Sequence, residues 1–269
     1  MAEARGRKSI FVTGAASGIG AETARYFAER DWFVGLYDVN EAGLAEVANE
    51  IGAANCTFGK LDVRERTDWK AAVAGFTEAT EGAMNVLFNN AGVGRHGWFE
   101  EITPEDSDWI IDVNVKGVVN GVYACLPLLR QTVGARVVNT ASTAGMVGSP
   151  QLAVYSATKF AVRGLTEALD AEFRDIDVRV TSLMPWFIDT PILDMPSHEG
   201  SNHRMKDDIE AAGQNVYPVS LAAERAWEAA HGKDIHYMVG KDAERARFVA
   251  RFLPGRLRKQ VMKGVPERA

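Results

Sequence analysis

The chain has 269 residues, of which 46% are hydrophobic and 25% are charged, as in a globular protein with a full apolar core. Its formal net charge of −6 argues against a general nucleic-acid-binding function. No apolar run approaches the roughly 20 residues that span a bilayer, and the charged segment Met1 to Lys8 lacks the apolar stretch of a secretory signal. Cys56 and Cys125 match no metal or redox spacing, so we expect a reduced, cytoplasmic protein without a metal site.

Short apolar, β-branched runs alternate with helical patterns along the chain. The runs expected to form strands are 10–12, 32–37, 56–63, 85–89, 137–139, 178–183 and 235–239. Helical patterns over 21–29 and 69–80, and an Ala-rich one after Asn40, separate the first of them. This alternation predicts an α/β fold with a doubly wound parallel sheet of seven strands and helices on both faces. No break rich in Pro, Gly or Ser divides the chain before Pro185, so we expect one catalytic domain over residues 1–240.

Two segments depart from this alternation. Residues 185–218 mix prolines and glycines with large apolar side chains, and a connection of this length predicts a substrate lid. Residues 241–269 carry nine Lys or Arg and three acids, interleaved with apolar residues. Such a basic amphipathic C-terminal extension either makes a peripheral contact with an anionic membrane surface or packs on its own domain or a neighbouring subunit.

A glycine-rich turn, Thr13 to Gly20, follows the first predicted strand and opens a helix. Glycine lets the backbone approach phosphate oxygens closely, and the start of a helix presents free N–H groups and a positive end. In this context the turn predicts a dinucleotide site, although a purely structural turn is the alternative. The residues expected to bind the cofactor here are Gly14, Ser17, Gly18, Ile19 and Gly20.

Asp38 ends the second predicted strand, eighteen residues after Gly20. An acid near this position accepts hydrogen bonds from the ribose hydroxyls, and its charge repels a 2′-phosphate. The next residues, Val39 and Asn40, supply no cation that would bind such a phosphate, so the sequence favours NAD over NADP. The alternative is that Asp38 only caps the following helix.

Tyr155 and Lys159 are four positions apart and share one helical face, and Ser142 precedes Tyr155 by thirteen positions. A phenol with a pKa near ~10 exchanges protons poorly at neutral pH until a nearby cation lowers its pKa, and we expect Lys159 to do so. Ser142 would polarise a substrate oxygen, and Tyr155 would take the alcohol proton as hydride leaves for a nicotinamide. The set predicts hydride transfer between a nicotinamide cofactor and a carbonyl or alcohol.

These motifs resemble those of the short-chain dehydrogenase/reductase family, from the first strand to about Gly240. The resemblance implies a Rossmann fold, a bound NAD and a homodimer or homotetramer. It implies that Asn114 holds a water that carries the proton from Lys159 to solvent, and that Lys159 binds the nicotinamide ribose. It also implies further cofactor contacts by Asp62 and Val63 at the adenine, by the fourth-strand motif Asn90, Ala91 and Gly92, and by Pro185, Ile188 and Thr190 near the nicotinamide.

One position departs from the family pattern, because Trp186 stands where the family usually has glycine after the sixth strand. Its indole either forms a wall of the substrate pocket or anchors the lid in the core. No Lys or Arg sits beside Ser142 or Tyr155 in the sequence to bind a carboxylate or phosphate, and His96 and Trp98 are candidates for the pocket mouth. The residues expected to contact substrate are Ser142, Ala144, Val147, Trp186, Phe187 and Met195.

The sequence therefore predicts an oxidoreductase that moves hydride between NAD(H) and a neutral hydrophobic or aromatic secondary alcohol or its ketone. One alternative keeps the cofactor but performs an epimerase or dehydratase reaction, which would need a longer C-terminal region. The other is a non-catalytic NAD-binding sensor or scaffold, which would be expected to lack one of the catalytic groups. The identity of the substrate, the stereospecificity and the direction of the reaction in the cell are not encoded in these motifs.

Overall fold

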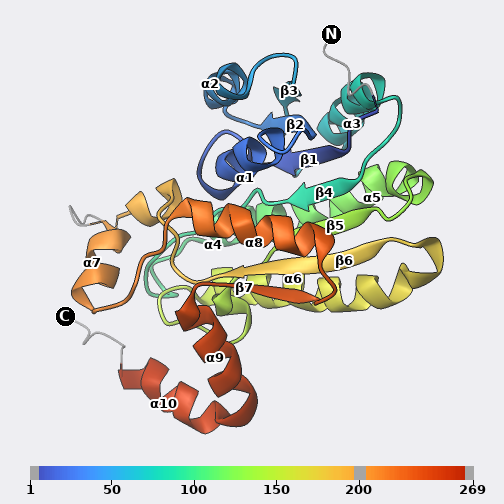
Figure 1. The fold of residues 1–269 in the computed structure, drawn as a ribbon. Helices are drawn as coiled ribbons and strands as arrows, with labels where there is room; N and C mark the ends of the chain where they lie inside the picture. The colour runs from blue at the N-terminus through green and yellow to red at the C-terminus, as the bar shows by residue number, and fades with distance from the viewer. Residues whose placement is uncertain (1–5, 197–203, 264–269) are drawn as a thin grey trace.

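The computed structural model describes residues 6–196 and 204–263, and it centres on one parallel sheet (Figure 1). Its seven strands stand in the order β3-β2-β1-β4-β5-β6-β7. All six neighbouring pairs are parallel. The strands are β1 (Ser9–Thr13), β2 (Phe33–Asp38), β3 (Cys56–Lys60), β4 (Val86–Asn89), β5 (Arg136–Thr140), β6 (Arg179–Pro185) and β7 (His236–Val239). The predicted fold class is confirmed.

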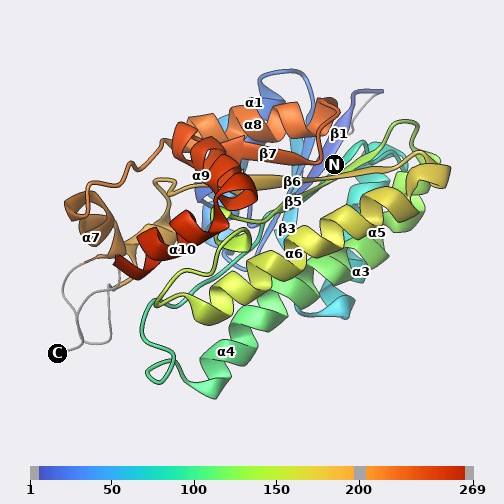
Figure 2. The same ribbon diagram turned by 90° about the horizontal axis from the view of Figure 1, so that it is seen from below.

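Ten α-helices accompany the sheet within the described residues. They are α1 (Gly18–Ala28), α2 (Glu41–Ile51), α3 (Arg66–Thr80), α4 (Pro104–Ile111), α5 (Gly117–Gln131), α6 (Ala153–Glu172), α7 (Met205–Ala211), α8 (Val219–His231), α9 (Lys241–Phe252) and α10 (Pro254–Lys263). Figure 2 shows α1 and α8 on one face of the sheet and α3, α5 and α6 on the other. No helix within these residues is long and apolar enough to cross a bilayer.

The sheet separates two apolar clusters because successive strand side chains point to opposite faces. Ile10 and Val12 of β1 belong to the cluster under α1, α2 and α8, whereas Phe11 between them packs with Trp69 and Phe76 of α3. The rings of Phe11 and Trp69 stack with centroids 5.6 Å apart. Strands buried on both faces explain why the sequence shows continuous apolar runs rather than alternation.

The third strand is shorter than predicted. The pattern 56–63 suggested a strand to Val63, but β3 ends at Lys60. The backbone N–H of Asp62 donates instead to Asp68 Oδ2 at 3.2 Å, in the turn that leads into α3. The chain thus leaves the sheet early and carries Asp62 and Val63 to the carboxyl ends of the strands.

The segments that departed from the alternation have defined structure in part. In the predicted lid, a 3-10 turn (Pro191–Asp194) is followed by α7, and residues 197–203 lie outside the described part of the chain. In the predicted extension, α9 and α10 are described and residues 264–269 are not. α9 packs on the domain through buried Ala243 and through Asp242, which accepts a hydrogen bond from Tyr217 Oη at 2.8 Å.

Candidate active site

A cavity of about 790 Å³ opens at the carboxyl ends of the strands, where the sheet order changes direction between β1 and β4. This crevice is where open parallel sheets bind their ligands. Apart from two, all of the predicted cofactor, catalytic and substrate residues border it. Those that do are Gly14, Ser17, Gly18, Ile19, Asp38, Asp62, Val63, Asn90, Ala91, Gly92, Ser142, Ala144, Val147, Tyr155, Lys159, Pro185, Trp186, Phe187, Ile188, Thr190 and Met195.

The two exceptions are Gly20 and Asn114; the residues before them, Ile19 and Val113, border the cavity instead. A Cβ at Gly20 would collide with the carbonyl oxygen of Gly14, so glycine here lets α1 pack against the turn. Gly20 thus shapes the turn without lining the cavity.

The glycine-rich turn is held by the loop after β4. Gly14 has a φ of 66°, and a Cβ there would lie 2.9 Å from the Cα of Ala91. Asn90 Nδ2 donates to the carbonyl oxygens of Thr13 and Gly14 at 3.1 and 3.3 Å. Gly18 has a φ of 53°, and a Cβ there would approach Thr190 Cγ2 to 3.1 Å. Glycines therefore let the turn pack closely against the loops after β4 and β6.

Asp38 is fixed beside this turn by two backbone donors. Its Oδ2 accepts from the N–H of Ala16 at 3.1 Å, and its Oδ1 accepts from the N–H of Asn40 at 3.0 Å. The cap of α2 is Asn40, whose Oδ1 accepts from the N–H of Gly43 at 3.2 Å. Asp38 is thus not the helix cap, and its carboxylate lies at the cavity wall.

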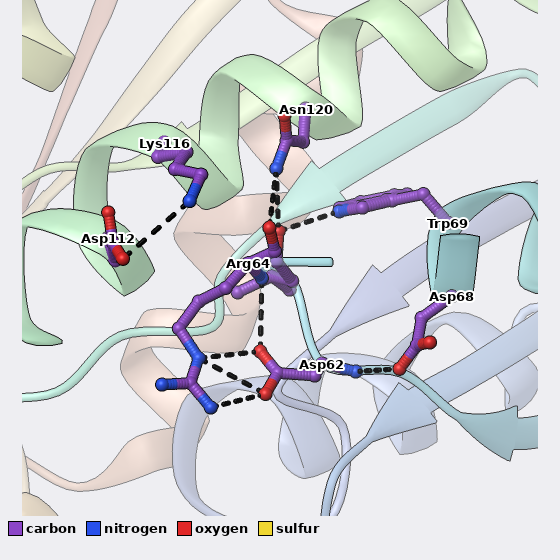
Figure 3. Close-up of polar contacts among 8 residues, drawn as sticks. Asp62, Arg64, Asp68, Trp69, Asp112, Lys116 and Asn120 are labelled. Atoms are coloured by element: carbon purple, nitrogen blue, oxygen red, sulfur yellow. Dashed lines mark hydrogen bonds and ion pairs between the residues drawn. The ribbon is translucent and has the colours of Figure 1, made fainter. Parts of the chain in front are cut away.

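Arg64, which the sequence analysis did not single out, also borders the cavity and forms an ion pair with Asp62 (Figure 3). Arg64 Nε donates to both carboxylate oxygens at 2.9 and 3.1 Å, and a terminal nitrogen reaches Oδ2 at 2.5 Å. These hydrogen bonds lower the pKa of Asp62. Trp69 Nε1 and Asn120 Nδ2 both donate to the carbonyl oxygen of Val63, at 2.9 and 3.1 Å, which fixes the neighbouring backbone. A contact between Asp62 and an adenine would have to share a carboxylate already occupied by Arg64.

The hydroxyl groups of Ser142 and Tyr155 meet at the cavity. Burial raises the pKa of Tyr155 to about 12, and the hydrogen bond from Ser142 opposes that rise. Ser142 follows β5 in extended conformation, and its Oγ accepts from the N–H of Ala144 at 3.1 Å. Ser142 comes from the loop after β5 and Tyr155 from α6, so the distance between them depends on how α6 packs on the sheet.

Lys159 lies behind Tyr155 on the same face of α6. Its Nζ is 5.4 Å from the Tyr155 ring centroid and donates to the carbonyl oxygen of Thr140 at 2.9 Å. Burial lowers the pKa of Lys159 to about 8. The expectation that Lys159 lowers the pKa of Tyr155 is wrong for the chain alone, because burial of the phenol dominates and the ammonium is turned toward Thr140.

Asn114 lies in a π-helical segment, Asp112–Lys116, between α4 and α5. Its side chain is buried, and its Oδ1 accepts from the N–H of Val93 at 2.8 Å. Its Nδ2 donates to the carbonyl oxygen of Val93 and to Thr158 Oγ1, at 2.9 and 3.1 Å. The side-chain amide of Asn114 therefore links the loop after β4 to α6. Because this amide is already hydrogen-bonded, the water expected at Asn114 would have to bind its backbone. Single π-turns inside helices occur frequently at functional sites.

The sequence model of the short chain dehydrogenase family matches residues 8–199, which contain every element described at the cofactor turn and at Ser142, Tyr155 and Lys159. The chain is an oxidoreductase of the short-chain dehydrogenase/reductase family. The predicted family membership is confirmed.

Curated proteins and solved structures resemble this short-chain dehydrogenase over most of its length. It is 38% identical to the oxidoreductase UcpA of Salmonella typhimurium, over 69% of this chain and 71% of that protein. It is 36% identical to the cyclohexanol dehydrogenase of an Acinetobacter species, over 69% of this chain and 75% of that protein. A short-chain dehydrogenase/reductase from Burkholderia phymatum, solved in complex with NAD, superimposes with a TM-score of 0.82 at 28% identity and covers 98% of both chains.

The substrate side of the cavity in this short-chain dehydrogenase is mostly apolar. A Cβ at Gly94 would lie within 4 Å of Tyr155, Ile192 and Met195, so lid residues stand directly beside the phenol. Trp186 borders the cavity and also packs on a small core cluster that includes Met184, with its ring 5.3 Å from the Phe187 ring. The indole of Trp186 therefore contacts both the cavity and the core, and its contact with substrate stays a prediction.

In the loop after β4, the charged residue that borders the cavity is not one of those predicted to lie at its mouth. Arg95 borders the cavity, whereas His96 and Trp98, the candidates for the mouth, do not. The guanidinium of Arg95 is bound to Asp106 at 3.0 Å and lies 4.7 Å from the Trp109 ring centroid. No sequence spacing pointed to this arginine, because its acid partner is supplied by α4. Its charge is balanced, so it does not by itself indicate an anionic substrate.

Among the described residues, no group of three or more His, Cys, Asp or Glu side chains is placed to hold a metal ion. Cys56 and Cys125 are both buried free thiols, and burial raises the pKa of Cys56 to about 11.

Proposed function

We propose that this chain is an NAD-dependent dehydrogenase or reductase that acts on a neutral hydrophobic or aromatic secondary alcohol and its ketone. The observation that carries the proposal is that Ser142, Tyr155 and Lys159 border one largely apolar cavity, with the Lys159 ammonium 5.4 Å from the Tyr155 ring centroid. The coarser statement, an oxidoreductase of this family, is already given by the family match.

The residues at the other end of the cavity fit NAD. Gly14 and Gly18 border the cavity, and α1 begins at Gly18, so the free N–H groups and positive end of this helix would face a pyrophosphate. The carboxylate of Asp38 is placed for ribose hydroxyls, and neither Val39 nor Asn40 offers a cation for a 2′-phosphate. The similar Burkholderia structure contains NAD. When bound, NAD would supply the hydride acceptor or donor.

The chain's own residues would handle the proton and the substrate oxygen. Ser142 donates a hydrogen bond that holds the oxygen of the substrate beside the phenol. Because burial keeps Tyr155 protonated, it is ready to give its proton to a ketone oxygen, and in the reverse direction it must take the alcohol proton. Lys159 would bind the nicotinamide ribose, and Asn114 holds the loop after β4 through its hydrogen bond with Val93.

The substrate class follows from the lining side chains. Apart from Ser142 and Trp186, whose buried Nε1 has no hydrogen-bond partner among the described residues, the predicted substrate contacts have no hydrogen-bonding side-chain groups; they are Ala144, Val147, Phe187 and Met195. An apolar wall favours a neutral ring or chain, because a charged group would lose its hydration there without a partner. A similar protein is named as a cyclohexanol dehydrogenase, and another as a dehydrogenase of a chlorinated cyclohexadiene diol, which agrees with such a class.

The two alternative functions have no observation in their favour, since Ser142, Tyr155 and Lys159 border one cavity and Asn114 holds Val93 in its wall. A homodimer or homotetramer and a cytoplasmic location remain predictions. The peripheral membrane contact of the extension also remains one, with Phe248, Phe252 and Met262 exposed on it.

The test compares Tyr155→Phe with Tyr123→Phe, a matched control because Tyr123 is exposed on α5. Turnover of cyclic secondary alcohols is followed by NADH absorbance, and NADH affinity by fluorescence. Loss of the phenol should lower kcat/KM by about 100-fold or more while leaving NADH affinity unchanged, because general acid–base catalysis contributes that much. Full turnover by Tyr155→Phe with normal NADH binding would refute the mechanism.

A further inference from the structure

The C-terminal helix α10 borders the same cavity as the predicted catalytic residues. Leu257 and Val261 of α10 line it, together with Ala246 of α9. Leu257 and Val261 are four positions apart and share one face of the helix. Both are partly buried, whereas the exposed residues of α10 include Arg256, Arg258, Lys259 and Met262. The helix therefore turns an apolar face to the cavity and a largely basic face to solvent.

α10 is held at this place by α9. The N–H groups of Arg256 and Leu257 donate to the carbonyl oxygen of Leu253 at 2.9 and 3.2 Å, which closes the first turn of α10 directly after α9. α9 in turn is anchored to the domain, since Ala243 is fully buried. Figures 1 and 2 both place α10 at the same end of the molecule as α7.

The lid supplies the other apolar wall. Leu193, Met195 and Met205 line the cavity, and the N–H of Met205 donates to the carbonyl oxygen of Met195 at 2.8 Å. None of the lining side chains supplied by the lid or by α9 and α10 is charged. Two separate segments thus contribute apolar side chains to the cavity that Tyr155 also lines.

The α10 wall comes from a part of the chain that the family match does not include. The matched residues end at 199, whereas α10 begins at Pro254. The residues predicted to move hydride and proton all precede that end, so the α10 wall lies outside the part of the chain that the family model matches.

Building on the proposed function, we propose that α10 determines substrate size, with Leu257 and Val261 contacting the apolar body of the alcohol remote from its hydroxyl. The wall gives a bulky alicyclic alcohol contacts that a small one cannot reach. A single methylene in an apolar pocket changes discrimination by at least about tenfold, so two such side chains suffice to select between ring sizes.

The first experiment compares Leu257→Ala and Val261→Ala with Met262→Ala, a matched control because Met262 is 66% exposed on the same helix. Cyclododecanol serves as the bulky substrate and cyclohexanol as the small one. Leu257→Ala should raise KM for cyclododecanol about tenfold, with KM for cyclohexanol and NADH affinity unchanged. Equal changes for both alcohols, or the same change in Met262→Ala, would overturn the proposal.

A second measurement needs no turnover. In Leu257→Cys and Met262→Cys, alkylation by a maleimide is timed with and without NADH and cyclododecanone; the native Cys56 and Cys125 are buried and serve as an internal blank. The ketone should slow alkylation at position 257 and leave position 262 unaffected. Absence of protection at position 257 refutes the proposal that α10 contacts the substrate, whether or not the enzyme turns over. Protection at 257 with no NADH formed from any alcohol supports the wall and refutes only the proposed function.

Discussion

Gly145 links the packing of α6 to the geometry of the predicted catalytic residues. It lies in the 3-10 turn Thr143–Gly145, directly after Ser142, and it is buried against α6. A Cβ at this position would stand 2.6 Å from the carbonyl oxygen of Lys159 and 2.9 Å from its carbonyl carbon. Replacement of Gly145 by alanine must therefore push the turn and α6 apart.

The size of the effect follows from these distances. The oxygen contact must widen by about 0.4 Å to reach 3.0 Å, the shortest approach that a Cβ normally shows. Ser142 moves with the turn and Tyr155 with α6, so the two hydroxyl groups move apart. Because a misplacement of about 1 Å can cost about 100-fold in rate, we expect kcat to fall about five- to tenfold. Overpacking should also destabilise the fold by about 1–3 kcal/mol.

Gly148→Ala is the matched control, because a Cβ at Gly148 meets nothing within 4 Å and its φ is not in the left-handed region. The assays are alcohol turnover by NADH absorbance, NADH affinity and urea unfolding. Gly148→Ala should match the wild type in all three, and Gly145→Ala should lose rate and stability but keep NADH affinity within about threefold, as a displacement confined to α6 would give. Wild-type kcat and stability in Gly145→Ala would refute this reasoning.

Two further predictions concern charge. Burial lowers the pKa of Lys159 from 10.5 to about 8, so the folded chain bears the cost of a buried ammonium below pH 8 and loses that cost as the pH rises toward 10. In urea unfolding without cofactor, the wild type should gain about 2 kcal/mol relative to Lys159→Met between about pH 7.5 and 9.5, and parallel pH curves would contradict this. Asp38→Ala should weaken NAD binding about tenfold, because a charged acceptor is lost, and should narrow the preference over NADP. An unchanged ratio of NAD to NADP affinity would show that Asp38 does not select the cofactor.

Local spacing carried most of what the sequence could predict. The turn from Gly14 to Gly20 and the pair Tyr155 and Lys159 are each contained in one helical turn or one loop, so their geometry follows from the element that holds them. The order of strands and helices followed from apolar periodicity for the same reason. These features were therefore visible without the structure.

What the sequence did not show depends on contacts between distant segments or on side-chain direction. The pattern of α10 predicted an amphipathic helix, but it could not indicate that Leu257 and Val261 face the cavity that Ser142 and Tyr155, over a hundred positions earlier, also line. Arg64 is only two residues from Asp62, but the predicted strand ended at Val63, and the sequence did not indicate that the turn after β3 brings the guanidinium of Arg64 onto the Asp62 carboxylate. The raised pKa of Tyr155 likewise depends on burial, which spacing does not report.

The π-helical segment Asp112–Lys116 joins α4 and α5 into one continuous helix and sets the rotation of α5 about the helix axis relative to α4. Each residue of an α-helix turns the chain by about 100°, so one extra residue in the turn rotates everything after it by that amount. Trp109, before the segment, borders the cavity, whereas Gly121, after it, packs so closely on Trp69 that a Cβ would lie 2.7 Å from the indole. A deletion of one residue here would leave the helix continuous but would turn the packing face of α5 away from α3. The extra residue of the π-helical segment therefore allows α4 to face the cavity while α5 packs in the core.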